Sequence, residues 1–390
     1  MKTILAPTGL SVNSYNPKFG VMKNYFIEDL TDKITALSFE KLAVGGDWSA
    51  ELNMNGSFVM AEDWLSNGLG RRICIVGHQG VPVWDGFVNK ITVSIGGLQH
   101  SSGAIEEIGN RVSVQYTPID YSVYPPVSGT STFTLITEDT GSQEKFGVIE
   151  KMYSGGSITD AEAIEVRDVY LTENSYPAST GDLNLSDSAA SELQISLECM
   201  GWVHWFRFYI YDDFTSGAVS LYTKLMSVIA ADPNGIFSLD RSNIKDNLLL
   251  VPAGEDGTRF AWDIIEELVS YGNDTSDERR LFGVYGNVIY YDTIPNTVKY
   301  VHKLSDPLQH ITDKISGANI FPYDVLPGQW ILISDFNAGI AERPAEFRKD
   351  PRMKFIESMR YDAPWTVSLM GGKTDKLSQY VQKLTMGGFV

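Results

Sequence analysis

The alternation of apolar and polar residues predicts β-strands in the first third of the chain. Between Trp48 and Met54 every second residue is apolar, and the polar residues between them point to the opposite face of the strand. Residues 71–95 have the pattern of a strand, a tight turn at 78–80 and a long second strand that bends at Gly86. This pattern indicates a sheet built from hairpins.

A single short helix is expected within this β-rich region. Apolar residues at helical spacing run from Phe58 to Leu65, and Asn67-Gly68 is a typical helix end. A further strand at Arg111–Tyr116 is expected to close the unit. Many short strands with hairpin-length connections and one helix favour a small β-barrel domain over residues 31–120.

Two regions lack this strand pattern. Residues 1–30 mix Pro, Gly, Asn and aromatic residues without a clear period, and we interpret them as an N-terminal arm. Residues 121–192 are predicted to be a linker and a helix-containing insertion, beginning with a Pro/Gly/Ser-rich stretch. Its helix is expected at 159–174, where Thr159 is a suitable cap and acidic residues in the first turn favour the positive end of the helix dipole.

An α+β domain is predicted for residues 193–275. A strand is expected to begin at Leu193 and to continue through the aromatic run that ends at Asp213. Two helices follow, at 219–231 and 260–271, and the second carries its apolar residues on one stripe.

Residues 276–390 are predicted to form a C-terminal β-barrel-like domain with a terminal helix. A hairpin is expected to turn at Gly286-Asn287, which is a favoured two-residue loop. The further elements expected are strands at 330–334, 354–361 and 365–369 and a helix at 375–386.

Composition and charge narrow the function classes. Of the 390 residues, 43% are hydrophobic and 12% aromatic, so the chain can bury sizeable cores and leans toward β structure. The net charge of −18 keeps the protein soluble and disfavours a nucleic-acid-binding role, because phosphates are repelled. Neither a secretory signal nor a membrane-spanning segment is expected. We interpret Cys74 and Cys199 as buried small hydrophobic residues of a chain made in a reducing cytoplasm.

The search for catalytic chemistry finds no motif. The five histidines have no metal-ligand spacing, and the adjacent acidic pairs 106–107, 212–213 and 266–267 point to different faces of their elements. Gly371-Gly372-Lys373-Thr374 resembles the end of a phosphate-binding loop, but Val367 stands where the loop needs its first glycine. We therefore predict no catalytic, cofactor-binding or metal-binding residues, no cofactor and no enzymatic activity.

The aromatic run around Trp202 has two interpretations. Its side chains could form a stacking platform for bases or sugars, or they could pack in a core. Core packing is favoured, because the acidic chain lacks the basic stripe that holds a nucleic-acid backbone. The residues concerned are Trp202, Trp205, Phe206, Phe208 and Tyr209.

Three groups of segments together resemble one protein family. They are Gly45-Gly46 with 63–65, 71–75, 83–88, 109–112 and Tyr116; 199–202 with 260–262 and 271–273; and 327–330 with 350–352 and 361–369. Their order resembles the tail-hub and tail-tip proteins of bacteriophages, which include the baseplate hubs of contractile phages. The resemblance covers roughly residues 30–390 in layout.

The resemblance implies a fold and a set of partners. It implies a β-rich, α+β protein with two small tube-type β-barrel domains and inserted α+β segments. Such hubs assemble as homo-oligomeric rings, usually trimers, that continue the tail tube. The expected partners are the tail tube or a distal tail protein, tail fibres or a central spike, and the tape measure protein. The expected location is the tail tip of a virion, assembled from protein made in the host cytoplasm, with genome DNA passing without specific binding.

Two other functions stay open from the sequence alone. The chain could be a distal-tail or receptor-binding protein that grips carbohydrate, or a tail-associated hydrolase of peptidoglycan or protein. Binding of host saccharides or clearing of host cell wall would distinguish these functions from a structural hub.

Overall fold

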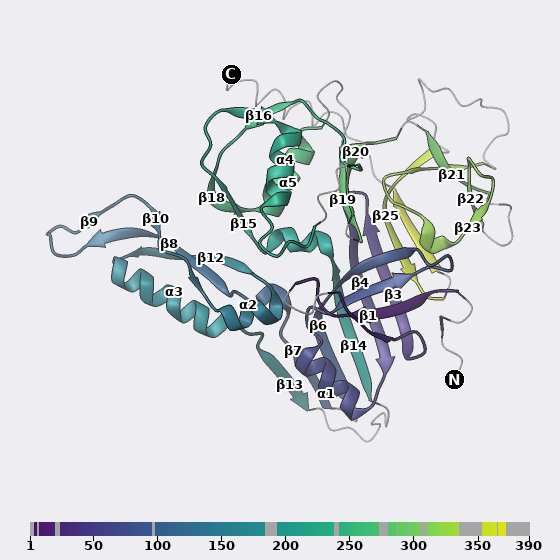
Figure 1. The fold of residues 1–390 in the computed structure, drawn as a ribbon, viewed down its shortest axis with the longest axis horizontal. Helices are drawn as coiled ribbons and strands as arrows, with labels where there is room; N and C mark the ends of the chain where they lie inside the picture. The colour runs from purple at the N-terminus through teal and green to yellow at the C-terminus, as the bar shows by residue number, and fades with distance from the viewer. Residues whose placement is uncertain are drawn as a thin grey trace.

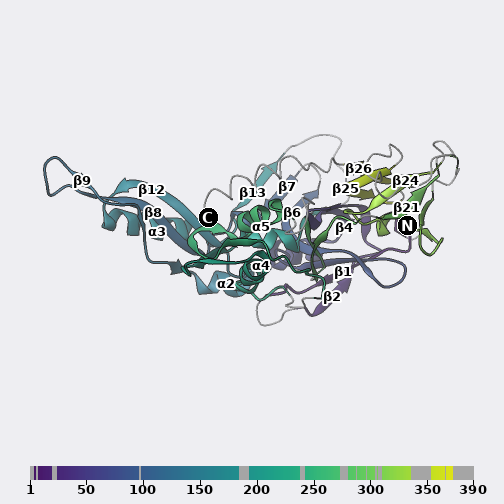
Figure 2. The same cartoon turned by 90° about the horizontal axis from the view of Figure 1, so that it is seen from above.

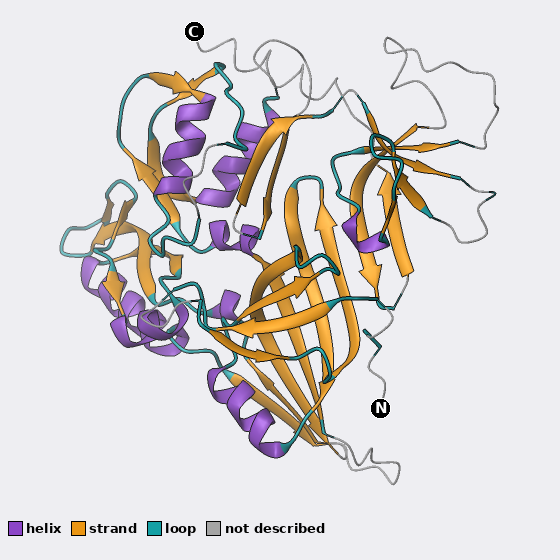
Figure 3. Cartoon of the chain, turned by 45° about the vertical axis from the view of Figure 1, so that its right-hand side comes forward, coloured by secondary structure: helices purple, strands orange, loops and turns teal. Residues whose placement is uncertain are grey.

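The computed structural model of the chain describes most of its residues. The described residues are 4–5, 8–19, 24–95, 98–183, 193–237, 242–272, 280–286, 288–295, 297–303, 305, 310–334, 353–364 and 366–371. They form a mostly β protein in which one large sheet curls into a half-barrel (Figure 3). The terminal helix expected at 375–386, and Gly372 to Thr374 of the loop resembling a phosphate site, lie outside the described residues.

The large sheet is built by antiparallel pairing of nine strands, some of which pair with strands far away in the sequence. Strand β14 (Gln194–Gly201) lies between β4 (Gly45–Asn55) and β6 (Pro82–Ile95). The order across the sheet is β2 (Phe26–Asp29), β1 (Ser11–Tyr15), β5 (Arg72–Val76), β6 (Pro82–Ile95), β14 (Gln194–Gly201), β4 (Gly45–Asn55), β3 (Ile34–Leu42), β25 (Met353–Asp362) and β26 (Thr366–Gly371).

The sheet confirms the strands predicted from alternation. The polar residues Glu51 and Asn53 of β4 are exposed or half-buried, whereas Ala50, Leu52 and Met54 are buried. Strands β5 and β6 form the predicted hairpin. Ser11–Tyr15, expected within an N-terminal arm, instead pairs with β5 along its whole length.

Further strands extend the sheet at its margins. The hairpin predicted at 281–292 is confirmed, and its first strand meets β4 in parallel at Gly45 and Gly46. The remaining strands are β7 (Leu98–Ser102), β13 (Ser179–Leu183), β19 (Arg280–Tyr285), β20 (Val288–Thr293), β21 (Val298–His302), β22 (Ile311–Asp313), β23 (Asn319–Ile320) and β24 (Trp330–Ile333), with the single turn η3 (Pro322–Asp324).

The helices predicted at 58–65, 159–174, 219–231 and 260–271 are confirmed. In α1 (Phe58–Asn67) the Ser57 side chain accepts a hydrogen bond from the Met60 N–H at 3.2 Å. Helices α4 (Leu221–Ala230) and α5 (Ala261–Ser270) pack together beside the large sheet, next to the strand pairs β15–β18 and β16–β17 (Figure 1). Gly272 follows α5 with a φ of +72°, a left-handed conformation that favours glycine. The four strands are β15 (Ile210–Asp213), β16 (Ala218–Ser220), β17 (Leu250–Pro252) and β18 (Glu255–Phe260).

The prediction that the strand from Leu193 continues through the aromatic run is wrong. β14 ends at Gly201, and Trp202–Arg207 forms a 3-10 helix, η2. Its side chains pack in the core between the large sheet and α5: Phe87 lies 5.3 Å from the rings of both Trp202 and Trp205. The preference for core packing over a stacking platform is confirmed, because these aromatic side chains are at most 3% exposed. A 3-10 turn replaces the strand because it points bulky rings to several sides of one crowded core.

An arm projects from the body along the long axis of the molecule (Figures 1 and 2). We define the arm as residues 111–178. Its centre is β8 (Arg111–Asp120), which pairs in parallel with β12 (Glu150–Ile158) on one edge. The other elements are β9 (Val127–Ser128), β10 (Thr132–Phe133), β11 (Thr137–Glu138), α2 (Thr140–Phe146) and α3 (Asp160–Asn174), and a one-turn helix, η1 (Ile105–Glu107), precedes β8.

The arm corrects one prediction and confirms another. The strand expected to close the first barrel does not do so, because β8 pairs with β9, β10, β11 and β12 in a separate sheet. The predicted Thr159 cap is confirmed: its hydroxyl accepts from the Glu162 N–H, and the Glu162 carboxylate accepts from the Thr159 N–H at 2.8 Å. Helix α3 covers one face of the arm sheet, where Tyr170 stacks on Tyr153 at 3.9 Å between ring centroids.

Among the helices that the structure describes, none combines the length and the apolar composition that a membrane crossing requires.

Candidate assembly surface

The histidines make local contacts. His204 is buried against the Trp48 ring at 4.2 Å, and its Nε2 lies 3.1 Å from the Trp48 carbonyl oxygen. Burial, together with the positive charge of Arg207, lowers the pKa of His204 to about 3. His78 packs on the Phe321 ring, and the His302 ring contacts the backbone of His310. Within the described residues, no group of three or more His, Cys, Asp and Glu is placed to hold a metal ion.

In each of the adjacent acidic pairs, one residue makes a local structural contact. Glu107 accepts a hydrogen bond from the Ala104 N–H at 3.2 Å, and Asp213 accepts one from the Thr215 N–H at 3.0 Å. Glu267 is paired with Arg259 at 2.5 Å. The two cysteines are buried and free, and burial raises the pKa of the Cys74 thiol to about 12.

A group that the sequence did not predict lies where several parts of the fold meet. We call Lys18, Asp47, Arg72, Asp85 and Trp202 the buried charge cluster. The Asp85 carboxylate accepts hydrogen bonds from Arg72 Nε at 2.9 Å and from Trp202 Nε1 at 3.0 Å. Lys18 Nζ lies 4.1 Å from the centroid of the Trp202 ring. The five residues come from the loop after β1, from β4, β5 and β6, and from η2, so the cluster joins distant segments.

Asp47 connects this cluster to the β19–β20 hairpin. Its Oδ2 accepts hydrogen bonds from the backbone N–H groups of Asp85 at 3.1 Å and Gly286 at 2.9 Å. Burial raises the pKa of the Asp47 carboxyl to about 7, although Lys41 and the two N–H groups oppose this shift. A group of this kind fastens the hairpin turn to the sheet.

The raised pKa makes stability fall with pH over a defined window. In the unfolded chain the Asp47 carboxyl titrates near 3.9, so between about pH 4 and pH 7 the folded state binds more protons. The contribution of the protonated carboxyl is complete below that window and is lost as pH rises through it. We expect Asp47→Asn, which keeps an oxygen acceptor for both N–H groups, to remove this loss and to gain roughly 2 kcal/mol or more relative to the wild type between pH 4.5 and 7.

Urea unfolding at several pH values between 4.5 and 7 measures this difference. Burial lowers the pKa of Lys18 to about 7, so this lysine begins to titrate only at the upper end of the range, and the measurements below about pH 6 carry the comparison. Asp362→Asn, at a half-exposed carboxylate on β25, is the control. Parallel stability curves for Asp47→Asn and wild type would contradict the assignment.

The root of the arm is held by the side-chain amides of Asn110 and Asn234. The Asn110 side chain is fully buried, donates to the Gly147 carbonyl oxygen at 2.7 Å and accepts from the Ile149 N–H at 2.8 Å. From the other side, the Asn234 side chain accepts from the Val148 N–H at 2.7 Å and donates to its carbonyl oxygen at 3.0 Å. Because the backbone at 147–149 is bonded from both sides, the arm is fixed in its direction.

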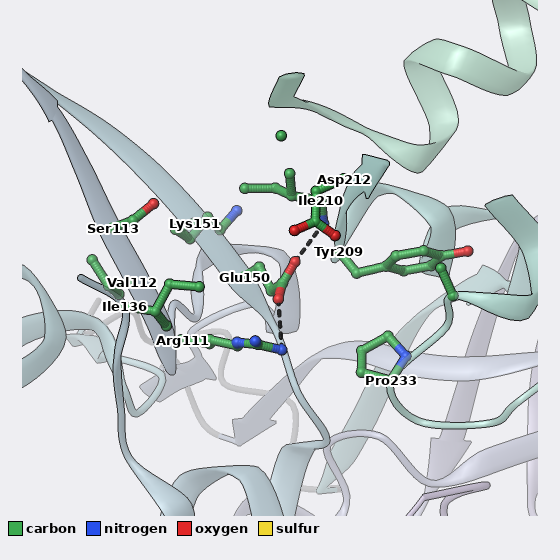
Figure 4. Close-up of a pocket in the computed structure, with 12 residues that line it drawn as sticks. Arg111, Val112, Ser113, Ile136, Glu150, Lys151, Tyr209, Ile210, Asp212 and Pro233 are labelled. Carbon is green, nitrogen blue, oxygen red and sulfur yellow. Dashed lines mark hydrogen bonds and ion pairs between the residues drawn. The ribbon is translucent and has the colours of Figure 1, made fainter. Parts of the chain in front are cut away.

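A small pocket of about 190 Å³ lies between the arm root and the α4–α5 unit (Figure 4). Glu150 bridges the two: its carboxylate lies 2.9 Å from Arg111 Nη1 and accepts from the Ile210 N–H at 2.5 Å. Burial raises the pKa of Glu150, and the Ile210 N–H and Arg111 partly offset this effect. Lys151 Nζ donates to the Glu106 carbonyl oxygen at 2.7 Å. These groups are engaged in holding the arm to the body.

The outer part of the arm exposes a concentration of apolar side chains. Of the 22 large hydrophobic residues exposed in the described chain, ten lie between residues 121 and 176. We define the arm tip as residues 121–133, the outer part of a stretch, 121–137, without a single charged residue. Its exposed apolar side chains are Tyr121, Val123, Tyr124, Val127 and Phe133. A concentration of exposed apolar side chains of this kind is typical of interaction sites.

A second apolar surface lies on the body. An open groove of about 860 Å³ runs between β2 and the start of α1; we call it the β2–α1 groove. Val59, which lines it, is 77% exposed, and the neighbouring Phe26 and Phe58 are exposed as well. The other residues that line it are Ile27, Glu28, Lys33, Asn55, Gly56, Ser57, Met60 and Asp63.

Sequence reasoning interpreted the arm tip as part of a linker. Its Pro, Gly and Ser content favoured that interpretation, but the missing charges in a chain with 21% charged residues were a signal that could have identified an interaction surface. The groove had no such signal, because it is made from segments that only the fold brings together.

No protein-family model matches the chain, and neither does any curated protein. Two solved structures are similar over most of their length. The 43 kDa tail protein of prophage MuSo2 from Shewanella oneidensis has a TM-score of 0.40 and 8% identity, with 95% of this chain and 98% of that chain covered. The tail protein from Neisseria meningitidis MC58 has a TM-score of 0.38 and 8% identity, with 91% and 92% covered. Likenesses at this level carry no conclusion about function.

Proposed function

We propose that the chain is a structural protein of a bacteriophage tail, the hub near the tail tip. One observation carries the proposal: a curled antiparallel sheet bears a rigidly rooted arm whose tip exposes apolar, uncharged surface. A monomeric soluble protein rarely keeps such a surface open to water, whereas an assembly subunit buries it against a neighbour.

The proposed assembly is a homo-oligomeric ring, a trimer, that joins the tail tube or a distal tail protein to fibres or a central spike. The two tube-type barrels expected from the sequence belong to this proposal. Strands β1 to β6 with β14 would contribute one of them, and β19 to β26 the other. The tape measure protein is a further proposed neighbour, and the site of action is the tail tip of the virion.

The charge balance supports a passage for DNA. A ring with a net charge of −18 on each subunit repels phosphate groups, so that a genome slides through instead of being held by salt-dependent contacts. A basic lining would release counterions and bind the same DNA.

The role proposed is not enzymatic. Its support is that His204, Glu107, Glu267, and Arg111 and Glu150 of the pocket in Figure 4 are engaged in local structural contacts. A zymogram on purified host cell wall tests this part, and a cleared zone would overturn it.

Imaging of the purified protein tests the hub itself. We expect negative-stain images to show closed rings with a central hole, and the mass in solution to be a multiple of the 43.3 kDa protomer. A compact monomer without a pore, at all concentrations up to about 100 μM, would contradict the proposal, because interfaces of stable assemblies bind well below that concentration.

A further inference from the structure

The arm tip and the β2–α1 groove are two different apolar surfaces on one chain. Figures 1 and 2 both place β9 of the tip at one end of the long axis, whereas α1 (Figure 1) and β2 (Figure 2) belong to the body. The hydrogen bonds of Asn110 and Asn234 fix the arm root, so the tip cannot fold back onto the groove of its own chain.

The groove suits an uncharged occupant. Its charged residues are already paired within the chain: Glu28 with Lys33 at 2.5 Å, and Asp63 with Arg71 at 2.8 Å. The Ser57 hydroxyl accepts the Met60 N–H that caps α1. A charged ligand would gain no new partner there and would lose its hydration, whereas aromatic and aliphatic side chains would cover Val59 and Met60.

The arm tip has the matching properties. Tyr124 is 96% exposed and Tyr121 is 62% exposed, and no charged residue lies between Asp120 and Glu138. Two copies of a chain with a net charge of −18 repel each other, so a contact between copies is favoured where the surfaces bring no unpaired charges together. The tip carries no charged residue, and the charged residues that line the groove are paired within the chain.

We propose that the arm tip of one copy docks in the β2–α1 groove of a second copy. This inference deepens the proposed hub and rests on it. The contact is heterologous, because tip and groove are different surfaces, and every copy offers one of each. Repeated contacts of this type close into a ring when the rotation between neighbours allows it.

Charge placed in either surface tests the contact. We expect Tyr124→Lys in the tip and Val59→Lys in the groove each to weaken self-association by about tenfold or more, since each would bury an unpaired ammonium group. Both side chains are largely exposed in the single chain, so folding is preserved and circular dichroism checks it. Ile315→Lys, at a side chain that is 92% exposed in the turn between β22 and β23, is the matched control and should leave association unchanged. Analytical ultracentrifugation over a concentration series gives the dissociation constants.

Two combinations identify the direction of the contact. In a chain with Tyr124→Lys and Val59→Glu, the lysine of one tip meets the glutamate of the next groove, and association should recover at least in part. An equal mixture of Tyr124→Lys and Val59→Lys chains has one intact tip and one intact groove, so it should form 1:1 dimers that do not grow into rings. An isologous contact would give no such dimers.

The outcomes separate this inference from the hub proposal. If wild-type rings form and neither single variant weakens them, the docking inference is wrong and the hub stands. If the wild type is a monomer at every concentration, both fall. An apolar tip could instead bind a membrane, and flotation with phosphatidylethanolamine–phosphatidylglycerol vesicles tests this. If Tyr124→Lys abolishes lipid binding and leaves self-association unchanged, the tip is a membrane-binding surface and the docking proposal is wrong.

Discussion

Replacing Gly201 with alanine is expected to abolish most of the stability of the protein. Gly201 ends β14 in an ordinary extended conformation, with φ of −66°, so its role is purely steric. A Cβ atom there would lie 1.7 Å from the Asp47 carbonyl oxygen. Because the obstacle is backbone, β4 and β14 would have to separate, and with them the hydrogen bonds of Asp47. We expect a loss of more than about 4 kcal/mol, a large part of the stability of a typical domain.

Soluble yield and thermal unfolding followed by circular dichroism measure this effect. The matched control is Gly129→Ala on the arm, where the nearest atoms to an added Cβ belong to Pro118 at 3.7 Å. That change should alter stability by no more than about 1 kcal/mol. A Gly201→Ala protein that melts with the wild type would show that the strand crossing is looser than described.

Replacing Asp85 with alanine is expected to cost about 3–5 kcal/mol. The carboxylate is only 1% exposed and neutralises Arg72, with Nη2 at 2.5 Å, while it also accepts the Trp202 indole N–H. Its removal leaves a guanidinium and an indole N–H without their partner in a largely buried place, which is the costly way to break a buried ion pair.

Urea denaturation of Asp85→Ala beside Asp362→Ala isolates the contribution of burial. Asp362 also pairs with an arginine, Arg360 at 3.2 Å, but both side chains are about half exposed. The exposed pair should contribute less than about 1 kcal/mol. Equal losses in the two variants would refute the importance of the buried charge cluster.

Local patterns predicted the elements well where side-chain periodicity decides the structure. The strand around Leu52, the helix of Trp64 and the Thr159 cap all follow from residues within a few positions of one another. Which strands pair with each other does not follow from such local patterns. β8 alternates as the second half of β4 does, yet its partners β9, β10, β11 and β12 place it in a separate sheet.

The aromatic run shows a different limit. Alternation alone suits a strand, but Trp202 and Trp205 must reach one core from neighbouring positions, and a 3-10 turn does this. The core role was predictable from burial statistics, whereas the backbone conformation depended on Phe87 and Phe282 from other segments.

The candidate surface was half visible in the sequence. The absence of charged residues from 121–137 can be read directly from the sequence. The exposure of these residues depends on the arm sheet and could not be read from it. The β2–α1 groove and the buried charge cluster each combine residues from several segments of the chain. No residue spacing in the sequence predicts either of them.

The position of β14 between β4 and β6 has a consequence for how the protein folds while the ribosome synthesises it. The edges of β4 and β6 stay open until β14 has been made, and the edge of β3 stays open until β25 (Met353–Asp362), near the end of the described chain, has emerged. Open strand edges pair readily with other nascent chains, and long-range pairing is slow. Production of this protein in a heterologous host should therefore gain from slow translation and low temperature, which give each edge time to meet its own late partner.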